Sequence, residues 1–364
     1  MAATPRVALS MLTLVPGGMG GSETYARELT RELAATDEVH ATAYVPEGAG
    51  GFSRGVPEVV VAGVRSGGST RERLAAMASS LVRSRRIRRS MDSPDVVHFP
   101  FTVPVPAPAR SAGCVQTLHD VQHLDLPQLF SRSELLYRRR FYEGAAAKAD
   151  IVITMSEFAR GRMIDALHLD PDRVRVAHLG VEPSDFVPNP GEREDFVLYP
   201  ARGWPHKNHA RLIEAMEILR RDRPGLRLVL TGGGLDTLGE LPDWVEVRGL
   251  VSTDELRALY RTAAVMAFPS LYEGFGLPPL EAMASGCPVA ASSAGSIPEV
   301  CGDAAVLFDP YSVDSIAEGI ARALDRGGEL YERGIAQAAG FTWERCREVH
   351  VEAYRDAAAR ASRR

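Results

Sequence analysis

Short, continuous apolar runs separated by longer amphipathic stretches are the feature that most constrains how this chain folds. In the first half these runs occupy residues 6–12, 40–45, 58–63, 95–100, 114–120, 150–156 and 174–181. Nearly every position in a run is apolar, as in strands that a parallel sheet buries on both faces. In residues 22–35, Tyr25, Leu29 and Leu33 recur at four-residue spacing, which predicts a helix packed on that sheet. This alternation predicts a doubly wound α/β domain.

A second series of the same kind follows residues 183–194, which hold three prolines and few apolar side chains and are the predicted linker. Its runs occupy residues 196–202, 226–233, 263–270, 288–293 and 304–310. A chain of 364 residues also exceeds one ordinary core. We therefore predict two Rossmann-like parallel-sheet domains facing each other across a cleft, formed by residues 1–190 and 191–342, with a C-terminal helix over 343–364. Ligands of such sheets bind beyond the carboxyl ends of the strands.

The amino-acid composition limits the classes of partner and the cellular location that this protein can have. Basic residues number 42 and acidic residues 47, so the net charge of -5 gives no reason to expect nucleic acid. The sequence shows no apolar run long enough for a bilayer and no basic signal-peptide region, and its four cysteines form no CxxC pair. These features predict a cytoplasmic protein. The arginine-rich residues 82–90 predict a solvated helix face, and peripheral contact with anionic lipid at the inner membrane face is the alternative.

The most specific motif is EGFGLPPLEAMASGCPV at residues 273–289. Gly274 and Gly276 permit a tight loop after a buried strand, and the two prolines that follow suit the first turn of a helix. We expect the free N–H groups of that helix to form an anion site. The carboxylates of Glu273, in the loop, and Glu281, in the predicted first turn, suit the hydroxyls of a sugar or ribose. For either glutamate alone, a role as a turn residue or as a partner of the helix dipole is the better explanation, but for the whole string the ligand-binding interpretation is preferred.

A second motif, YPARGWPHKNHA at residues 199–210, follows a strand and precedes a helix. Arg202 and Lys207 lie in the predicted loop, with Asn208 as a candidate N-cap. Two cations near a helix start can neutralise a departing diphosphate. Solvated surface cations are the alternative, although Lys207 is one of only two lysines in the chain.

Two glycine clusters predict close approach of the backbone to a ligand. GGMGGSE lies between the first strand and first helix, and TGGG follows a strand in the second half. The first does not match the GxGxxG fingerprint, and the acidic residue that an NAD site needs is missing. The glycines concerned are Gly17, Gly18, Gly20, Gly21, Gly232 and Gly233.

TLHD, at residues 117–120, ends a predicted strand. His119 there is a candidate for donating to a hydroxyl or transferring a proton, with Asp120 orienting it; a purely structural histidine is the alternative. Asp170 and Asp172 form a DxD pattern, but the proline between them predicts a turn. We expect no metal site.

Taken together, these motifs resemble the retaining glycosyltransferases of family 4, which have the GT-B fold. GGMGG, the HD of residues 119–120, RGWPHKN and the E-x7-E string occur in the expected order over nearly the whole chain. FTW at residues 341–343, followed by a helix, also resembles the family's closing segment, which crosses back onto the first domain.

The resemblance implies a role for each motif. Arg202 and Lys207 would bind the diphosphate of a nucleoside-diphosphate sugar, and Glu281 its ribose. Glu273 would face the donor sugar, together with the backbone that follows it (Gly274, Phe275, Gly276 and Leu277). His119 would approach the transferred sugar, and the Gly17–Gly21 loop would line the cleft near the phosphates and acceptor. The backbone around Arg248 and Leu250 would contact the base.

The resemblance leaves the reaction details open. It implies metal-independent hexosyl transfer without a bound cofactor to a sugar, a lipid-linked glycan or a small molecule, with the oligomeric state undetermined. A front-face mechanism and a covalent intermediate both remain open. The alternatives are a sugar-nucleotide epimerase or phosphorylase of the same fold, an NAD-dependent oxidoreductase suggested by GGMGG alone, and a silent nucleotide-sugar-binding module.

Overall fold

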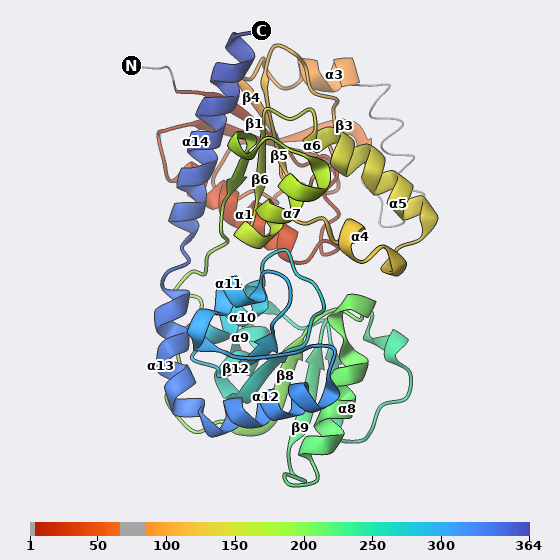
Figure 1. Ribbon diagram of the computed structural model, residues 1–364. Coiled ribbons are helices and arrows are strands. Elements are labelled where there is room, and N and C mark those ends of the chain that lie inside the picture. Colours follow the sequence, from red (N-terminus) through yellow and green to blue (C-terminus); the bar gives the residue numbers. More distant parts are fainter. Residues whose placement is uncertain (1–3, 66–83) are drawn as a thin grey trace. The chain divides into compact units, whose positions relative to one another are not determined.

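The computed structural model describes residues 4–65 and 84–364. The chain divides into two compact units (Figure 1), one formed by Met1–Leu179 with Trp343–Arg364 and the other by Gly180–Thr342. Each unit is built on a parallel sheet flanked by helices, as the alternating pattern of the sequence predicts. Val82 and Arg83, which begin the arginine-rich run, lie outside the described residues.

The sheet of the first unit has seven strands in the order β3-β2-β1-β4-β5-β6-β7, and every neighbouring pair is parallel. Each predicted apolar run supplies one strand. The last run forms only a short strand, because its later apolar residues are buried in the segment that leaves the sheet. The strands are β1 Arg6–Ser10, β2 His40–Glu47, β3 Glu58–Arg65, β4 Val96–Phe99, β5 Gly113–Thr117, β6 Ile151–Thr154 and β7 Val174–Val176.

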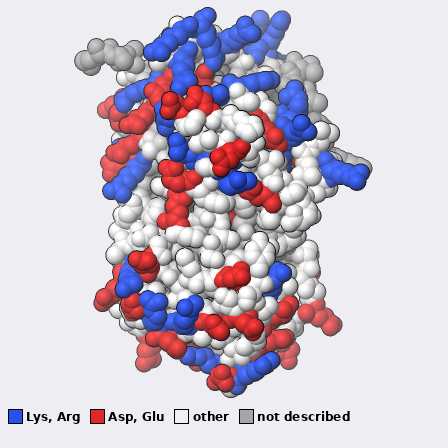
Figure 2. All heavy atoms as spheres, in the orientation of Figure 1, with Lys and Arg blue, Asp and Glu red and all other residues white. Residues whose placement is uncertain are grey.

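Helices flank this sheet, and a π-helix at Arg139–Glu143 interrupts one of them. The described helices are α1 Gly21–Ala34, α3 Ser84–Arg89, α4 Gln122–Asp125, α5 Arg132–Arg138, α6 Gly144–Ala146, α7 Glu157–Leu167 and α14 Trp343–Ser362. Figure 2 shows basic side chains gathered around α3 and the C-terminal end of α14.

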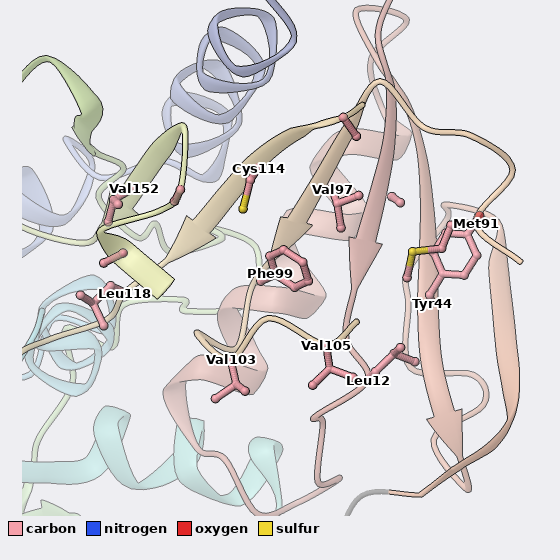
Figure 3. Close-up of a cluster of buried hydrophobic side chains, with 14 of the residues drawn as sticks. Leu12, Tyr44, Met91, Val97, Phe99, Val103, Val105, Cys114, Leu118 and Val152 are labelled. Carbon is pink, nitrogen blue, oxygen red and sulfur yellow. The ribbon is translucent and has the colours of Figure 1, made fainter. Parts of the chain in front are cut away.

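Side chains alternate between the two faces of this sheet, so each face has its own packing partners. Figure 3 shows the core on one face, where Val97, Phe99, Cys114 and Leu118 pack together. The opposite face of β5 packs against α14. At Gly113 a Cβ atom would lie 2.6 Å from the carbonyl carbon of Ala357, so the backbone of α14 lies directly on the strand.

The sheet of the second unit has six strands in the order β10-β9-β8-β11-β12-β13, all parallel. The sequence prediction missed the edge strand β10, because charged Glu246 and Arg248 interrupt its apolar residues. The strands are β8 Glu194–Pro200, β9 Arg227–Thr231, β10 Val245–Gly249, β11 Ala263–Phe268, β12 Val289–Ser292 and β13 Val306–Phe308.

Six α-helices of the described chain belong to this unit: α8 His209–Leu219, α9 Thr253–Thr262, α10 Leu277–Ala284, α11 Ile297–Cys301, α12 Val313–Asp325 and α13 Gly327–Ala338. In both units, every helix within the described ranges is too short or too polar to cross a bilayer.

Candidate active site

The loops that follow β8, β9 and β10 are joined by their backbones at the carboxyl edge of the second sheet. The amide of Ala201 donates to Thr231 O (2.8 Å), that of Gly203 to Gly233 O (3.0 Å) and that of Gly232 to Gly249 O (2.7 Å). Parallel strands place all their carboxyl ends at one edge, so neighbouring strands bring these loops together.

Two glycines make this close approach possible. Gly232 has φ 136°, and a Cβ atom there would lie 2.4 Å from the oxygen of Ala201. A Cβ atom on Gly203 would lie 2.1 Å from the oxygen of Gly234. The sequence prediction singled out Gly232 and Gly233 but missed Gly203, since the need for it depends on a loop distant in sequence.

Arg202 lies beside the glycine-rich loop after β9. A Cβ atom on Gly233 would lie 3.7 Å from both Nη1 of Arg202 and Cδ2 of Leu250. The Arg202 guanidinium also lies 5.5 Å from the ring centre of Trp204. Arg202, Gly233 and Leu250, named separately in the sequence, are therefore neighbours. Leu250 is 74% exposed, whereas Arg248 forms ion pairs with Glu246 and Glu255.

Asn208 does not cap helix α8, contrary to the sequence prediction. It has a left-handed backbone (φ 63°), which carries its side chain away from the helix amides, and it forms no side-chain cap hydrogen bond. Its side-chain nitrogen Nδ2 donates instead to the carbonyl oxygens of Pro269 (3.0 Å) and Pro310 (2.7 Å). The buried side chain thus ties the loop after β8 to those after β11 and β13.

Lys207 and Glu273 form an ion pair with 2.6 Å between Nζ and Oε1, and their side chains are only 13% and 15% exposed. Both are held by buried hydroxyl groups. Tyr199 Oη donates to the carbonyl of Lys207 (2.6 Å), and Ser296 Oγ donates to that of Glu273 (3.0 Å). The motifs that carry the two residues therefore meet at one place in the fold.

Helix α10 begins at Leu277, before both prolines, and this corrects the predicted position of Glu281. Glu281 lies in the second turn, since the first turn contains no acidic residue. The prolines at the second and third helical positions carry no N–H group, so they remove two of the expected donors. The amides of Gly276 and Leu277 remain at this helix start.

Glu281 is partly buried beneath helix α9. Its Oε2 accepts a hydrogen bond from Tyr260 Oη at 2.9 Å. Burial raises the pKa of Glu281 to about 7, although the Tyr260 hydrogen bond and the charge of Arg257 oppose this shift. The sequence prediction missed Tyr260, which is fully buried and belongs to no recognisable motif.

In the first unit, the glycine cluster lies between β1 and α1, as predicted. Gly17 and Gly20 have φ values of 71° and 58°, which favour glycine. The amide of Gly17 donates to Glu23 Oε2 at 2.9 Å. One helical turn into α1, the ring of Tyr25 lies edge-to-face with that of His119, with 5.5 Å between centroids.

His119 lies just beyond the carboxyl end of β5, and its Nε2 is 3.0 Å from the carbonyl oxygen of Pro100. A carbonyl only accepts, so Nε2 carries the proton. Burial lowers the pKa of His119, which keeps the ring neutral at pH 7 and leaves Nδ1 as an acceptor. Asp120 does not hydrogen-bond to the ring as predicted. Its Oδ1 accepts from the amide of Gln122 at 3.0 Å, because a short turn follows.

The DxD pattern is explained by turn chemistry. Oδ1 of Asp170 accepts a hydrogen bond from the amide of Asp172 at 2.9 Å, and Pro171 begins a 3-10 turn. Across the two described ranges, no three His, Cys, Asp or Glu side chains gather as metal ligands would.

Comparison with known proteins identifies the family. "Glycosyltransferase Family 4" matches residues 19–185, and "Glycosyl transferases group 1" matches residues 181–340. O-antigen chain mannosyltransferase B of Escherichia coli is 32% identical over 273 residues, covering 68% of this chain and 71% of that protein. The chain belongs to the family 4 glycosyltransferases. It is thus an enzyme that transfers sugars, and its relatives place this family in glycan biosynthesis.

Solved structures agree on the GT-B fold of this family 4 glycosyltransferase. Sucrose-phosphate synthase from Thermosynechococcus elongatus superposes with a TM-score of 0.77 at 20% identity, over 98% of this chain and 100% of that one. Anabaena HepE in complex with UDP-glucose superposes with a TM-score of 0.68 at 16% identity, over 99% and 100% of the two chains.

Proposed function

We propose that this family 4 glycosyltransferase moves a hexose from a nucleoside-diphosphate sugar to an acceptor hydroxyl with retention of the anomeric configuration. One observation carries the proposal. Arg202, the Lys207–Glu273 pair and Glu281 come from loops and a helix on one edge of one sheet, beside the start of α10. Cations, amide dipoles and carboxylates are the groups that a diphosphate flanked by two sets of hydroxyls requires.

Cleavage of the sugar–phosphate bond leaves an oxocarbenium-like sugar and a nucleoside diphosphate that gains negative charge. Arg202 and Lys207 would stabilise that charge, Arg202 through its forked guanidinium and Lys207 as a point charge. Glu273 lies 2.6 Å from the Lys207 ammonium and fixes its position in the loop. The same pair would place the sugar-facing carboxylate directly beside the phosphate-facing ammonium.

In the first unit, the glycine loop Gly17–Gly21 would line the acceptor side, and neutral His119 would accept a hydrogen bond from a sugar hydroxyl through Nδ1. In the second unit, the backbone at the exposed residue Leu250 would contact the base. The relatives guide the choice of donor. The Escherichia coli protein is named as a mannosyltransferase and HepE is bound to UDP-glucose, so mannose and glucose donors come first.

Calorimetric titration with the UDP, GDP, ADP and TDP sugars, followed by turnover assays with the donor that binds, tests the function. We expect one nucleotide class to bind and NMR of the product to show the donor's own anomeric configuration. Release of an epimerised sugar nucleotide without any acceptor would indicate the epimerase alternative instead. Nucleotide binding without turnover on sugar, lipid-linked glycan and small-molecule acceptors would contradict the proposed transfer.

Replacing Glu281 by alanine is expected to weaken nucleoside-diphosphate binding by about 10- to 100-fold, because one charge-assisted hydrogen bond to ribose is worth roughly 1.5–3 kcal/mol. Calorimetry with the free nucleotide measures this directly. Glu329→Ala, at an exposed glutamate on α13, is the matched control and should leave the affinity unchanged. Equal affinities of the wild-type protein, Glu281→Ala and Glu329→Ala would show that Glu281 does not bind the ribose.

The pKa of about 7 also predicts how donor affinity varies with pH. The protonated carboxyl loses acceptor capacity, so affinity should fall as pH drops through 7, by about tenfold between pH 8 and pH 6. The nucleotide phosphates titrate in the same range, so Glu281→Gln measured over the same series provides the correction. A pH dependence identical in Glu281→Gln would show that Glu281 contributes nothing to it.

A further inference from the structure

A chain of buried polar side chains joins the C-terminal helix to the centre of the first sheet. Three of its members, Cys346, His350 and Tyr354, follow one another at four-residue spacing on α14 and so face the sheet together. The sheet supplies His98 from β4 and Thr117 from β5, and helix α1 supplies Tyr25. Each of the six residues is at most 1% exposed, so their polar atoms must satisfy one another.

At one end of this row of hydrogen-bonded side chains, the chemistry of each acceptor determines which group donates. His350 Nδ1 lies 2.7 Å from the carbonyl oxygen of Cys346, which only accepts, so Nδ1 donates. Burial lowers the pKa of His350 to about 4, so its ring is neutral and Nε2 accepts. Tyr25 Oη, 2.7 Å from Nε2, therefore donates its only proton to His350.

The remaining bonds follow by the same logic. Tyr25 Oη has no proton left, so the Thr117 hydroxyl, 2.9 Å away, donates to it. His98 Nε2, 2.8 Å from Thr117 Oγ1, must then donate to that oxygen. Its pKa too is lowered by burial, so His98 Nδ1 accepts from Tyr354 Oη at 2.9 Å. All five bonds run in one direction, from Tyr354 to the Cys346 carbonyl.

This row of hydrogen-bonded side chains supports the His119 ring in three ways. Tyr25, whose ring is fixed by bonds to Thr117 and His350, packs edge-to-face against His119. Thr117 ends the strand from which His119 emerges two residues later. His98 lies two residues before Pro100, whose carbonyl fixes the protonation of His119 Nε2.

We propose that this one-directional chain positions the His119 ring for sugar transfer, so that Tyr25, Thr117, His98 and His350 are positioning residues and α14 supports the reaction from a distance. The inference rests on the role of His119 in the proposed function. A ring displaced by a fraction of an ångström loses its alignment with a substrate hydroxyl, whereas donor binding in the second unit does not depend on it.

A matched set of threonine variants tests the proposal in the full-length enzyme. Thr117→Val keeps the side-chain shape and removes both hydrogen bonds, whereas Thr117→Ser keeps the hydroxyl. We expect Thr117→Val to lower kcat about tenfold with an unchanged KM for the donor, and Thr117→Ser to restore most of the loss. Thr154→Val is the control, because the buried hydroxyl of Thr154 on β6 has no hydrogen-bond partner among the described residues.

A cycle with His119→Ala separates positioning from general stability. Thr117→Val, and Tyr25→Phe as a second variant should Thr117→Val fail to fold, should lower kcat in the wild-type background and have no further effect beside His119→Ala. Equal losses in both backgrounds, with His119→Ala itself impaired, would overturn the inference and leave the role of His119 standing. Unimpaired turnover of His119→Ala would overturn the inference and the proposed role of His119 together.

Discussion

Lys207→Ala is expected to reduce turnover by about 10²-fold or more, the usual cost of removing a preorganised charge that faces a departing anion. Arg202→Ala should do the same, since the two residues flank one loop after β8. Steady-state kinetics on protein checked for folding measures both effects. Lys148→Ala is the matched control, because Lys148 is the only other lysine, is exposed and lies in the first unit. Near-normal turnover of both variants would show that this loop does not bind the diphosphate.

The ion pair with Glu273 complicates the interpretation of Lys207→Ala, because it leaves a largely buried carboxylate without its partner. The double variant Lys207→Ala/Glu273→Gln removes both charges, and its reference is Glu273→Gln alone, which already lacks the sugar-facing carboxylate. If Lys207→Ala fails only because Glu273 is unpaired, the double variant should turn over as fast as Glu273→Gln. If the ammonium itself stabilises the leaving phosphate, turnover of the double variant should fall well below that of Glu273→Gln, and this is the result that we expect.

The sheet architecture could be predicted from the sequence because parallel strands buried on both faces leave a direct signal. The runs at 95–100 and 263–270 need no tertiary information to be identified as strands. The edge strand β10 was not predicted, because Glu246 and Arg248 face solvent and pair with neighbouring charges, which interrupts the apolar run. The start of α10 also differed, since two adjacent prolines fit several positions of a first turn equally well.

The sequence was sufficient to predict which residues form the candidate site, but not the contacts that hold them in place. Charged residues after buried strands indicated which loops meet, and the structure brings Lys207 and Glu273 together. The support of those residues was not predictable, because it depends on loops far apart in sequence. Asn208 was predicted as a helix cap and instead joins three loops, and Tyr260, which carries no recognisable motif, holds Glu281. Such roles appear only once the strand order is known.

Gly203→Ala is expected to destabilise the protein by about 2–4 kcal/mol and to lower turnover by about 10²-fold, although Gly203 contacts no proposed substrate group. The added Cβ atom would lie 2.1 Å from the oxygen of Gly234, and backbone cannot rotate out of the way as a side chain can. The loops after β8 and β9 would have to separate, which breaks the bond from the Gly203 amide to Gly233 O. Arg202, the preceding residue, would then leave its place beside Gly233.

Thermal unfolding and steady-state kinetics of Gly203→Ala measure the two effects, and Gly225→Ala provides the control. Gly225 lies in the turn just before β9, where an added Cβ atom meets no atom of the described chain within 4 Å, so stability should change by no more than about 0.5 kcal/mol. The two variants add the same methyl group at opposite edges of the second sheet, after β8 and before β9. A stable, fully active Gly203→Ala enzyme would mean that the loop carrying Arg202 can shift freely, and the close backbone contact would then not be what positions its guanidinium.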